Sequence, residues 1–197
     1  MLIDRIEFIT KTKAKVTFDN GVECILYRSE IRREGLEENK EVPEEQFSSI
    51  MKEIVLKRAK KKVMDLLIRS DKTEKELRDK LKRDQYPEFI IEKAIAYVHS
   101  YHYINEQNYL ENYVKYHSRG KSRIMLVQEL TQKGIDRENI FDCLEEFYDE
   151  REQVRYLVAK KVRGRLEITP EEKEKISRYL FRKGFKSSDI FGELKKY

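Results

Sequence analysis

The side chains best suited to engage a partner in this sequence are lysines and arginines that gather at three places. Their positive charge suits phosphate groups and other anions. The first group lies in the run KRAKKK and the second in the run SRGKSR. The third group is the densest, and we expect it to make the main contact. The members are Lys57, Arg58, Lys60, Lys61 and Lys62; Arg119, Lys121 and Arg123; and Lys160, Lys161, Arg163, Arg165, Arg178, Arg182 and Lys183.

The first group also has a simpler interpretation. A run such as KRAKKK is typical of a helix face exposed to water. The cations of SRGKSR lie near the start of an expected helix, where the helix dipole disfavours positive charge. A partner contact therefore explains the second group better. If these cations touch phosphates, affinity should fall steeply as the salt concentration rises.

Charge is distributed unevenly along the 197 residues, which carry a formal net charge of +5 and have a pI near 9.0. Two segments are basic: residues 46–105 with 14 basic and 9 acidic residues, and residues 151–197 with 14 and 7. Two are acidic: residues 1–45 with 8 basic and 11 acidic residues, and residues 106–150 with 6 and 10. The basic excess favours an anionic partner such as nucleic acid or an acidic protein. The acidic middle argues against a uniform DNA-binding surface.

Other kinds of site are weakly indicated. The tyrosines of YVHSYHYINEQNYLENYVKY could stack on single-stranded DNA, although aromatic residues at helical spacing more often belong to a core or an interface. No cysteine or carboxylate completes a zinc set with His99, His102 and His117, so we expect neither a metal nor a cofactor. We find no phosphate-binding glycine loop, nucleophile elbow or paired carboxylates, and we expect no enzyme. Cys24 and Cys143 are interpreted as buried free thiols.

The first 45 residues predict a small antiparallel sheet. The expected strands are residues 2–9, 13–18 and 22–28. Asp19–Gly21 is a hairpin-turn signal, since Gly accepts positive φ. A sheet of two or three strands is not stable alone, so it should pack against the helices that come after it in the chain. A short helix is expected near Ser29–Arg33, and a further helix should begin after Pro43 with acidic residues in its first turn.

The rest of the chain consists of three repeats with a period of about 50 residues. When Leu81, Leu130 and Leu180 are aligned, apolar residues on both sides of them fall into register. The aligned sets are Leu77, Leu126 and Ile176; Tyr86, Ile135 and Phe185; Ile91, Ile140 and Ile190; and Ile95, Leu144 and Leu194. This length accommodates three helices joined by short loops. These apolar positions predict the core of each repeat.

Each repeat predicts the same three helices. The expected first helices are residues 55–69, 106–118 and 151–164; the second, 73–84, 122–133 and 170–183; and the third, 87–103, 137–150 and 187–197. Thr73 with Glu76 forms a capping box, and Thr169 with Glu172 forms another beside Pro170.

The turn between the second and third helices has its own signature. Gly134 and Gly184 stand where a helix ends in a left-handed residue. Asp136 and Ser187 are then expected to cap the third helices. In the first repeat Gln85 stands at the position of the glycine. We therefore predict a mainly α fold: three tandem three-helix-bundle repeats in an elongated, curved array, with a small N-terminal β-hairpin or antiparallel sheet. The expected domains are residues 1–45, 46–105, 106–150 and 151–197.

At these residues the sequence resembles the RecX family, regulatory proteins of the RecA recombinase. The shared motifs are Arg69-Ser70, Glu76-Leu77 and Lys80-Leu81 in the first repeat; Arg123-Ile124, Glu129-Leu130 and Lys133-Gly134-Ile135 in the second; and ISRYLFRKGFKSSDI in the third. The ordered set covers residues 55–197. The chain departs from the family pattern at Gln85-Tyr86-Pro87, where a Lys-Gly turn is usual, and at Tyr109 and Tyr113.

The resemblance implies a function. RecX-like proteins lie in the helical groove of the RecA–single-strand DNA filament, bridge its protomers, stop its growth and lower the ATPase, strand-exchange and coprotease activities of RecA. They have no active site of their own. The resemblance therefore predicts a non-enzymatic regulator of DNA repair, homologous recombination and the SOS response, which we expect to be a monomer. We expect it to be cytoplasmic, because Asp4, Arg5 and Glu7 interrupt any signal-peptide pattern at the N-terminus. Its partners would be RecA and the filament, with weak direct DNA binding and no membrane contact.

Two other functions remain open from the sequence. Three-helix units resemble helix-turn-helix domains, so the chain could be a DNA-binding transcriptional regulator. Against this, the third helices RENIFDCLEEFYDE and SSDIFGELKKY lack a basic face to read a groove. The chain could also be a helical-repeat scaffold for a different protein.

Overall fold

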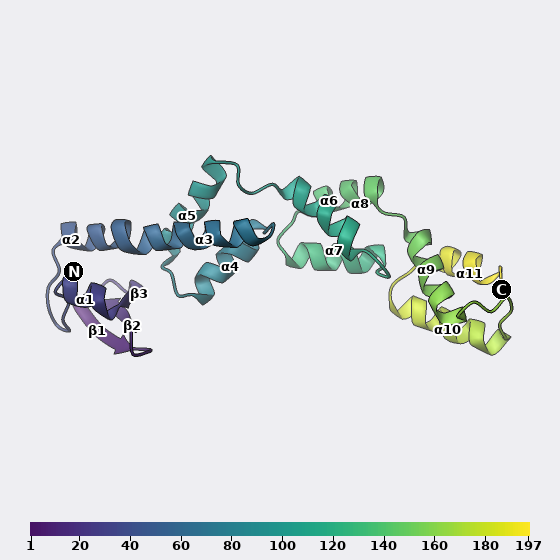
Figure 1. The fold of residues 1–197 in the computed structure, drawn as a ribbon, viewed down its shortest axis with the longest axis horizontal. Helices are drawn as coiled ribbons and strands as arrows, with labels where there is room; N and C mark the ends of the chain where they lie inside the picture. The colour runs from purple at the N-terminus through teal and green to yellow at the C-terminus, as the bar shows by residue number, and fades with distance from the viewer. The chain divides into compact units, whose positions relative to one another are not determined.

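The computed structural model describes residues 1–197 and contains two compact units, Met1–Ile104 and Asn105–Tyr197. Figure 1 shows that helices dominate both units and that the strands lie near the N-terminus. The predicted mainly α fold with a small N-terminal antiparallel sheet is confirmed. The elongated, curved arrangement of the repeats and the four domain boundaries stay predictions.

The sheet has three antiparallel strands in the order β1-β2-β3. They are β1 (Ile3–Phe8), β2 (Lys13–Phe18) and β3 (Glu23–Tyr27). Apolar residues of β2 alternate into the core as predicted, and Gly21 in the β2–β3 turn has a φ of 78°. An irregularity in the register between Ile3 and Arg5 breaks the alternation of β1. A bulge of this kind turns the side chains after it to the other face, which explains the imperfect pattern in the sequence.

A continuous helical run packs beside the sheet. After the short helix α1 (Arg28–Arg33), the chain forms α2 (Glu44–Ser49), a π-helix (Ile50–Leu56) and α3 (Lys57–Arg69) without a break. The helix predicted to begin after Pro43 is confirmed. The separate helix start predicted at residue 55 is wrong, because the helical run continues through that position. The segment from residue 44 to residue 69 contains no Gly or Pro to end a helix.

The sheet and the first repeat share one hydrophobic core, as the small size of the sheet requires. The ring of Phe18 meets that of Phe47 edge-on, with centroids 5.0 Å apart. Cys24 belongs to this core and Cys143 to that of the second repeat, and both are free and buried, as predicted. Burial raises the pKa of the Cys24 thiol to about 12.

The first repeat is completed by α4 (Glu74–Arg83) and α5 (Glu88–Ser100). The capping box of Thr73 and Glu76 is present. Gln85 takes the left-handed conformation, with a φ of 60°, so the turn geometry is kept without glycine. Helix α5 ends at Ser100, three residues before the predicted end at 103, and His102 is left-handed with a φ of 54°.

The second unit contains the second and third repeats, each around its own core. Its helices are α6 (Glu106–His117), α7 (Arg123–Gln132), α8 (Arg137–Phe147), α9 (Glu150–Val162), α10 (Pro170–Arg182) and α11 (Ser187–Leu194). The apolar residues aligned in the sequence are buried in all three repeats, except Tyr86, which is partly buried. Gly134 and Gly184 are left-handed, with φ of 88° and 79°. The turn between the second and third helices of these repeats is thus a helix end with a left-handed glycine, as predicted.

Several local predictions differ from the structure. Asp136 caps α8 and Thr169 caps α10 within a capping box, as expected. Ser187, however, is already the first residue of α11; the N-cap position belongs to Lys186, whose side chain makes no capping bond. Helix α8 ends at Phe147 instead of 150, because Asp149 caps the next helix. Helix α11 ends at Leu194 instead of 197.

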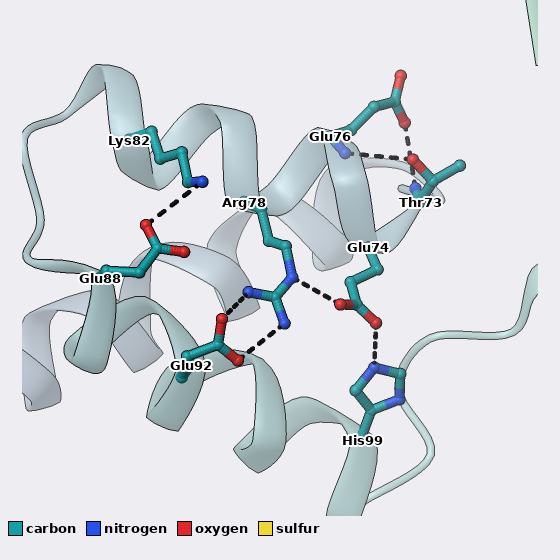
Figure 2. A network of polar contacts seen from close by, with 8 residues as sticks. All are labelled: Thr73, Glu74, Glu76, Arg78, Lys82, Glu88, Glu92 and His99. Atoms are coloured by element: carbon teal, nitrogen blue, oxygen red, sulfur yellow. Dashed lines mark hydrogen bonds and ion pairs between the residues drawn. The ribbon is translucent and has the colours of Figure 1, made fainter. Parts of the chain in front are cut away.

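Polar contacts join α4 to α5 in the first repeat (Figure 2). The guanidinium of Arg78 contacts Glu74 on its own helix at 2.6 Å and both carboxylate oxygens of Glu92 on α5. His99 Nε2 lies 2.6 Å from the second oxygen of Glu74. Burial raises the pKa of Glu74, but the hydrogen bonds from Arg78 and His99 outweigh it and bring that pKa below its ordinary value.

We expect this network to give the first repeat an acid-sensitive stability. The pKa of Glu74 is lowered by folding, so its contribution is present above the ordinary value of 4.5 and is lost as pH falls through the folded pKa. Arg78→Met should lower the free energy of unfolding by about 1 kcal/mol at pH 7 and by clearly less at pH 3. Unfolding followed by circular dichroism against pH measures this difference. Arg69→Met, which removes an exposed cation of the same repeat, should show no such pH dependence; equal losses for Arg78→Met at both pH values would contradict the prediction.

Candidate nucleic-acid interface

The third repeat contains a pocket of about 590 Å³ whose polar lining is almost entirely basic. The lining residues are Leu157, Lys160, Lys161, Arg163, Arg165 and Tyr179. Four of the six side chains are cationic and none is acidic. The structure thus gathers four residues of the densest predicted group around one hollow.

The end of α9 builds this pocket. Lys160 and Lys161 lie in its last turn, and Arg163 caps it in the left-handed conformation, with a φ of 55°. The next residue, Gly164, is left-handed as well, with a φ of 78°. Two consecutive left-handed residues end the helix and turn the chain sharply. The turn brings Arg165 back to the carbonyl of Val162, which its Nε contacts at 3.1 Å.

The cations of the pocket differ in how they are neutralised. Arg165 pairs with Glu172 at 2.8 Å. The ammonium of Lys161 lies 4.5 Å from the centroid of the Tyr179 ring, a cation–π contact. Lys160, Lys161 and Arg163 are exposed and make no ion pair. Three positive charges therefore remain available to an anion in contact with the pocket.

The other predicted cations of the third repeat lie outside the pocket lining. Arg178 is 3.6 Å from Glu174 on the same exposed helix face, and Arg182 is exposed in the last turn of α10. Lys183 reaches the second repeat, where its Nζ donates to the carbonyl of Gly120 at 3.4 Å. Lys183 thus contributes to the contact between repeats.

Arg119 and Arg123 of the second group are engaged within the protein. The guanidinium of Arg119 lies 4.3 Å from the ring centroid of Tyr156. A terminal nitrogen of Arg123 donates to the carbonyl of Leu144 at 3.2 Å, joining α7 to the end of α8. Arg119 remains exposed, whereas Arg123 is partly buried.

Lys121, the third member of that group, belongs to a polar cluster. Its ammonium pairs with Glu129, which also accepts a hydrogen bond from the hydroxyl of Tyr113 at 2.8 Å. Burial and the bond to Glu129 raise the pKa of Tyr113 to about 12. Burial raises the pKa of Glu129, but the hydrogen bonds from Lys121 and Tyr113 bring it below its ordinary value. The internal partner explains this loop cation without an external one.

The first group, on α3, is divided among different roles. Lys57 pairs with Glu53 one turn earlier at 2.6 Å, and Lys62 pairs with Asp84 at 3.3 Å. Lys61 is exposed and makes no ion pair. Only part of the charge run is therefore open to a partner.

Arg58 and Lys60 face the protein. The guanidinium of Arg58 donates to the carbonyl of Ile25 on β3 at 2.9 Å and pairs with Glu30 of α1. The ammonium of Lys60 lies 4.4 Å from the ring centroid of Tyr97. The structure assigns Arg58 to the attachment of the sheet to the first repeat.

Comparison with known proteins agrees with this architecture. Family models for the first, second and third three-helix domains of RecX match residues 59–97, 105–144 and 149–192. A regulatory protein RecX from Caldanaerobacter subterraneus is 34% identical over 160 residues, covering 79% of each chain. One from Clostridium beijerinckii is 30% identical and covers 98% of this chain and 93% of its own length.

This chain belongs to the RecX family. Solved structures support the same conclusion. A crystal structure of regulatory protein RecX matches 100% of this chain and 99% of its own, with a TM-score of 0.65 and 25% identity. RecX from Lactobacillus salivarius matches 71% of this chain and 94% of its own, with a TM-score of 0.60 and 26% identity. The predicted family is confirmed, and with it the general role of a regulatory protein.

The aromatic residues of this RecX family member divide into two kinds. Tyr109, Tyr113 and His117 stack along α6, and Tyr109 is buried, so this part of the tyrosine-rich stretch serves the core of the second repeat. Tyr101 and Tyr103 stack on each other at 5.6 Å and are 58% and 46% exposed. No group of three or more His, Cys, Asp or Glu residues is arranged to hold a metal ion. None of the helices combines the length and apolar character needed to cross a lipid bilayer.

Sequence reasoning missed Tyr179, which lines the basic pocket. It lies on α10 between apolar residues such as Ile176 and Leu180, which belong to the core. The sequence pattern therefore gives no sign that Tyr179 has a different role. Its partner Lys161 is 18 residues away, by residue number, on another helix. A residue-by-residue comparison of the third repeat with the others could mark a tyrosine here but could not place it beside α9.

Proposed function

We propose that this protein binds RecA and lies in the groove of the RecA–single-strand DNA filament, where it inhibits the recombinase, ATPase and coprotease activities. It would thereby modulate DNA repair, homologous recombination and the SOS response in the cytoplasm. It would act as a monomer, without chemistry of its own, and would bind free DNA only weakly.

The observation that carries this proposal is the basic pocket of the third repeat. Three unpaired cations next to a tyrosine ring favour an anionic surface. A filament of protein on single-stranded DNA carries the negative charge of the DNA phosphates. Family membership supports RecA as the protein component. We propose that Lys160, Lys161 and Arg163 make the principal contact, with the exposed Arg119, Lys61 and Arg182 as secondary contacts.

The rival function of a transcriptional regulator is less well supported. In a helix-turn-helix domain the second of the paired helices reads the major groove. Here the third helix of the second repeat, α8, exposes four acidic residues, and phosphates would repel them. They are Glu138, Asp142, Glu145 and Glu146. The scaffold alternative differs only in the identity of the protein partner.

The proposal is tested by titrating the protein into a RecA ATPase assay that depends on single-stranded DNA. We expect inhibition at well below equimolar amounts, because a bound molecule that blocks growth affects many protomers. Inhibition should weaken between about 50 mM and about 200 mM salt, since phosphate contacts release counterions. Binding to DNA alone, measured in parallel, separates action on the filament from removal of its DNA.

Lys160→Ala combined with Lys161→Ala should raise the half-inhibiting concentration roughly tenfold to thirtyfold, because each lost phosphate contact contributes about 0.7 log unit near 0.1 M salt. Lys175→Ala combined with Lys195→Ala removes the same charge from exposed positions of the same repeat outside the pocket. This control should inhibit like the parent protein. If both double variants weakened inhibition of the RecA ATPase equally, the pocket would not be the contact site. Absence of inhibition by the parent protein, with tight binding to one duplex sequence, would support the transcriptional regulator instead.

A further inference from the structure

The first unit contains a second cavity, of about 490 Å³, that none of the proposed RecA or filament contacts explains as a whole. It lies between the N-terminal sheet and the first repeat. Strands β2 and β3 line it with Lys13 and Tyr27, and α3 lines it with Lys61. The end of α4 and the turn after it contribute Arg83 and Tyr86. The cavity therefore exists only because the sheet packs against the repeat.

Fixed contacts hold the walls of this cavity in place. Arg58, one of the lining residues, ties β3 to α3 through the carbonyl of Ile25. The ion pair of Lys62 with Asp84 ties α3 to the end of α4. The left-handed Gln85 then sets the direction of the α4–α5 turn. The site is thus formed before any ligand arrives, which reduces the entropy lost on binding.

The charges on the cavity favour an anion. Five lining residues are cationic and two are acidic, and Glu30, the partner of Arg58, adds a third acidic group, so the excess is two positive charges. Arg58 and Lys62 are already neutralised by their carboxylate partners. Lys61 has no ion pair, the ammonium of Lys13 has only the ring of Tyr27 at 5.4 Å, and Arg83 contacts only the backbone carbonyl of Asp79.

Aromatic rings distinguish this cavity from a simple anion site. Tyr27 is 36% exposed, with the guanidinium of Arg58 4.6 Å from its ring centroid, and the partly buried Tyr86 also lines the cavity. A ligand that uses both rings and cations must carry an aromatic group and an anionic group on one framework. Nucleotides do so, and grooves that combine aromatic rings with a basic surface bind single strands.

We propose that this cavity, the sheet–repeat groove, binds a short segment of single-stranded nucleic acid, with phosphates on Lys61, Lys13 and Arg83 and a base against Tyr27 or Tyr86. The N-terminal sheet then has a binding role in addition to its place in the core. The proposal concerns nucleic acid alone, and it can hold or fail independently of any action on RecA.

Photo-crosslinking with the full-length chain tests the location. A thymidine oligomer of about 12 nucleotides carrying 5-iododeoxyuridine should crosslink to peptides that contain Tyr27 or Tyr86, because a base bound in the groove would stack on one of these rings. Mass spectrometry identifies the peptides. Crosslinks confined to residues 105–197 would overturn the proposal.

Binding measurements with charge-matched variants test the contact. Lys61→Gln should weaken binding of the oligomer roughly fivefold near 0.1 M salt and lower the salt slope by about 0.7, the values for one phosphate contact on a single strand. Lys52→Gln, an exposed lysine earlier in the same helical run and outside the groove, should change neither quantity. Equal effects of the two substitutions would contradict the proposal.

Two further comparisons complete the test. Tyr27→Leu should weaken binding by about fivefold or more, whereas Tyr27→Phe should retain it, since only the ring is required. Thermal melts identify any loss of folding in the Leu variant. Thymidine monophosphate and an acidic peptide serve as competitors. Competition by either one as effective as that of the oligomer would reject a single strand as the ligand.

Discussion

Arg58→Ala should lower the free energy of unfolding of the first unit by about 2–3 kcal/mol. The guanidinium holds three groups at once: the carbonyl of Ile25, the carboxylate of Glu30 and the ring of Tyr27, whose centroid is 4.6 Å away. The side chains of the ion pair are only 25% and 16% exposed. Removal of the guanidinium leaves a largely buried carboxylate and a carbonyl without their donor, which costs more than the bonds themselves contribute.

Hydrogen exchange of the backbone amides in β2 and β3 measures the effect where it is expected, because local opening is read residue by residue. Arg33→Ala is the matched control: its pair with Glu34 involves a side chain that is 64% exposed, so the loss should stay below about 0.5 kcal/mol. Arg58→Lys keeps the charge but not the planar fork, and should fall between the two. If Arg58→Ala lowered the free energy of unfolding no more than Arg33→Ala does, Arg58 would not be the residue that attaches the sheet.

Ser122→Ala should destabilise the contact between the second and third repeats by about 2–3 kcal/mol. Ser122 is fully buried. Its hydroxyl accepts from the amide of Met125, capping α7, and donates to the carbonyl of Lys183 in the third repeat. The substitution removes a cap, worth about 1 kcal/mol, and also leaves that carbonyl without its donor.

Denaturant unfolding and amide exchange across residues 105–197 measure the loss. Ser177→Ala provides the control, because this hydroxyl, also buried, donates only to the carbonyl of Lys173 within its own helix. That change should cost less than about 0.5 kcal/mol, since such back-bonds slightly weaken helices. If the two serine substitutions lowered the free energy of unfolding by similar amounts, the hydrogen bond from Ser122 to the carbonyl of Lys183 would contribute no stability.

Gly184→Ala probes the same contact from the other side. An added Cβ would lie 3.3 Å from the hydroxyl of Ser122 and 3.4 Å from Ile124. Gly164→Ala meets no atom within 4 Å, and its φ of 78° nearly equals the 79° of Gly184. Both variants carry the same backbone strain of about 1 kcal/mol. If Gly184→Ala lowers the free energy of unfolding more than Gly164→Ala does, the difference therefore measures the packing of the second repeat against the third.

Features that depend on near neighbours in the chain could be predicted from the sequence. The capping boxes at Thr73 and Thr169 and the left-handed Gly134 and Gly184 follow from side-chain and backbone chemistry within a few residues. The alignment of buried leucines and isoleucines indicated the three repeats and, with the short motifs, the family. Even here, the cap of α11 was misplaced by one residue, at Ser187 instead of Lys186, because neighbouring residues compete for a helix end.

Features that depend on distant residues could not be predicted. Nothing in the sequence distinguishes the roles of the five cations in the KRAKKK run, yet Arg58 attaches the sheet while Lys61 stays exposed. The partners of Arg58 and Lys62, Ile25 and Asp84, lie on other parts of the first unit. The same holds for Tyr179, which meets Lys161 only after α9 and α10 pack together.

The sequence by itself therefore determined the class of fold and the repeat, since these rest on periodicity and local caps that act over a few residues. It also indicated the RecX family, through the resemblance of its short motifs to that family. The tertiary structure alone decided which cations are neutralised and which remain free, and which aromatic rings join them. Ion pairs and cation–π contacts depend on separations of a few ångströms between helices and strands. These separations are fixed only when the helices and strands pack around their hydrophobic cores.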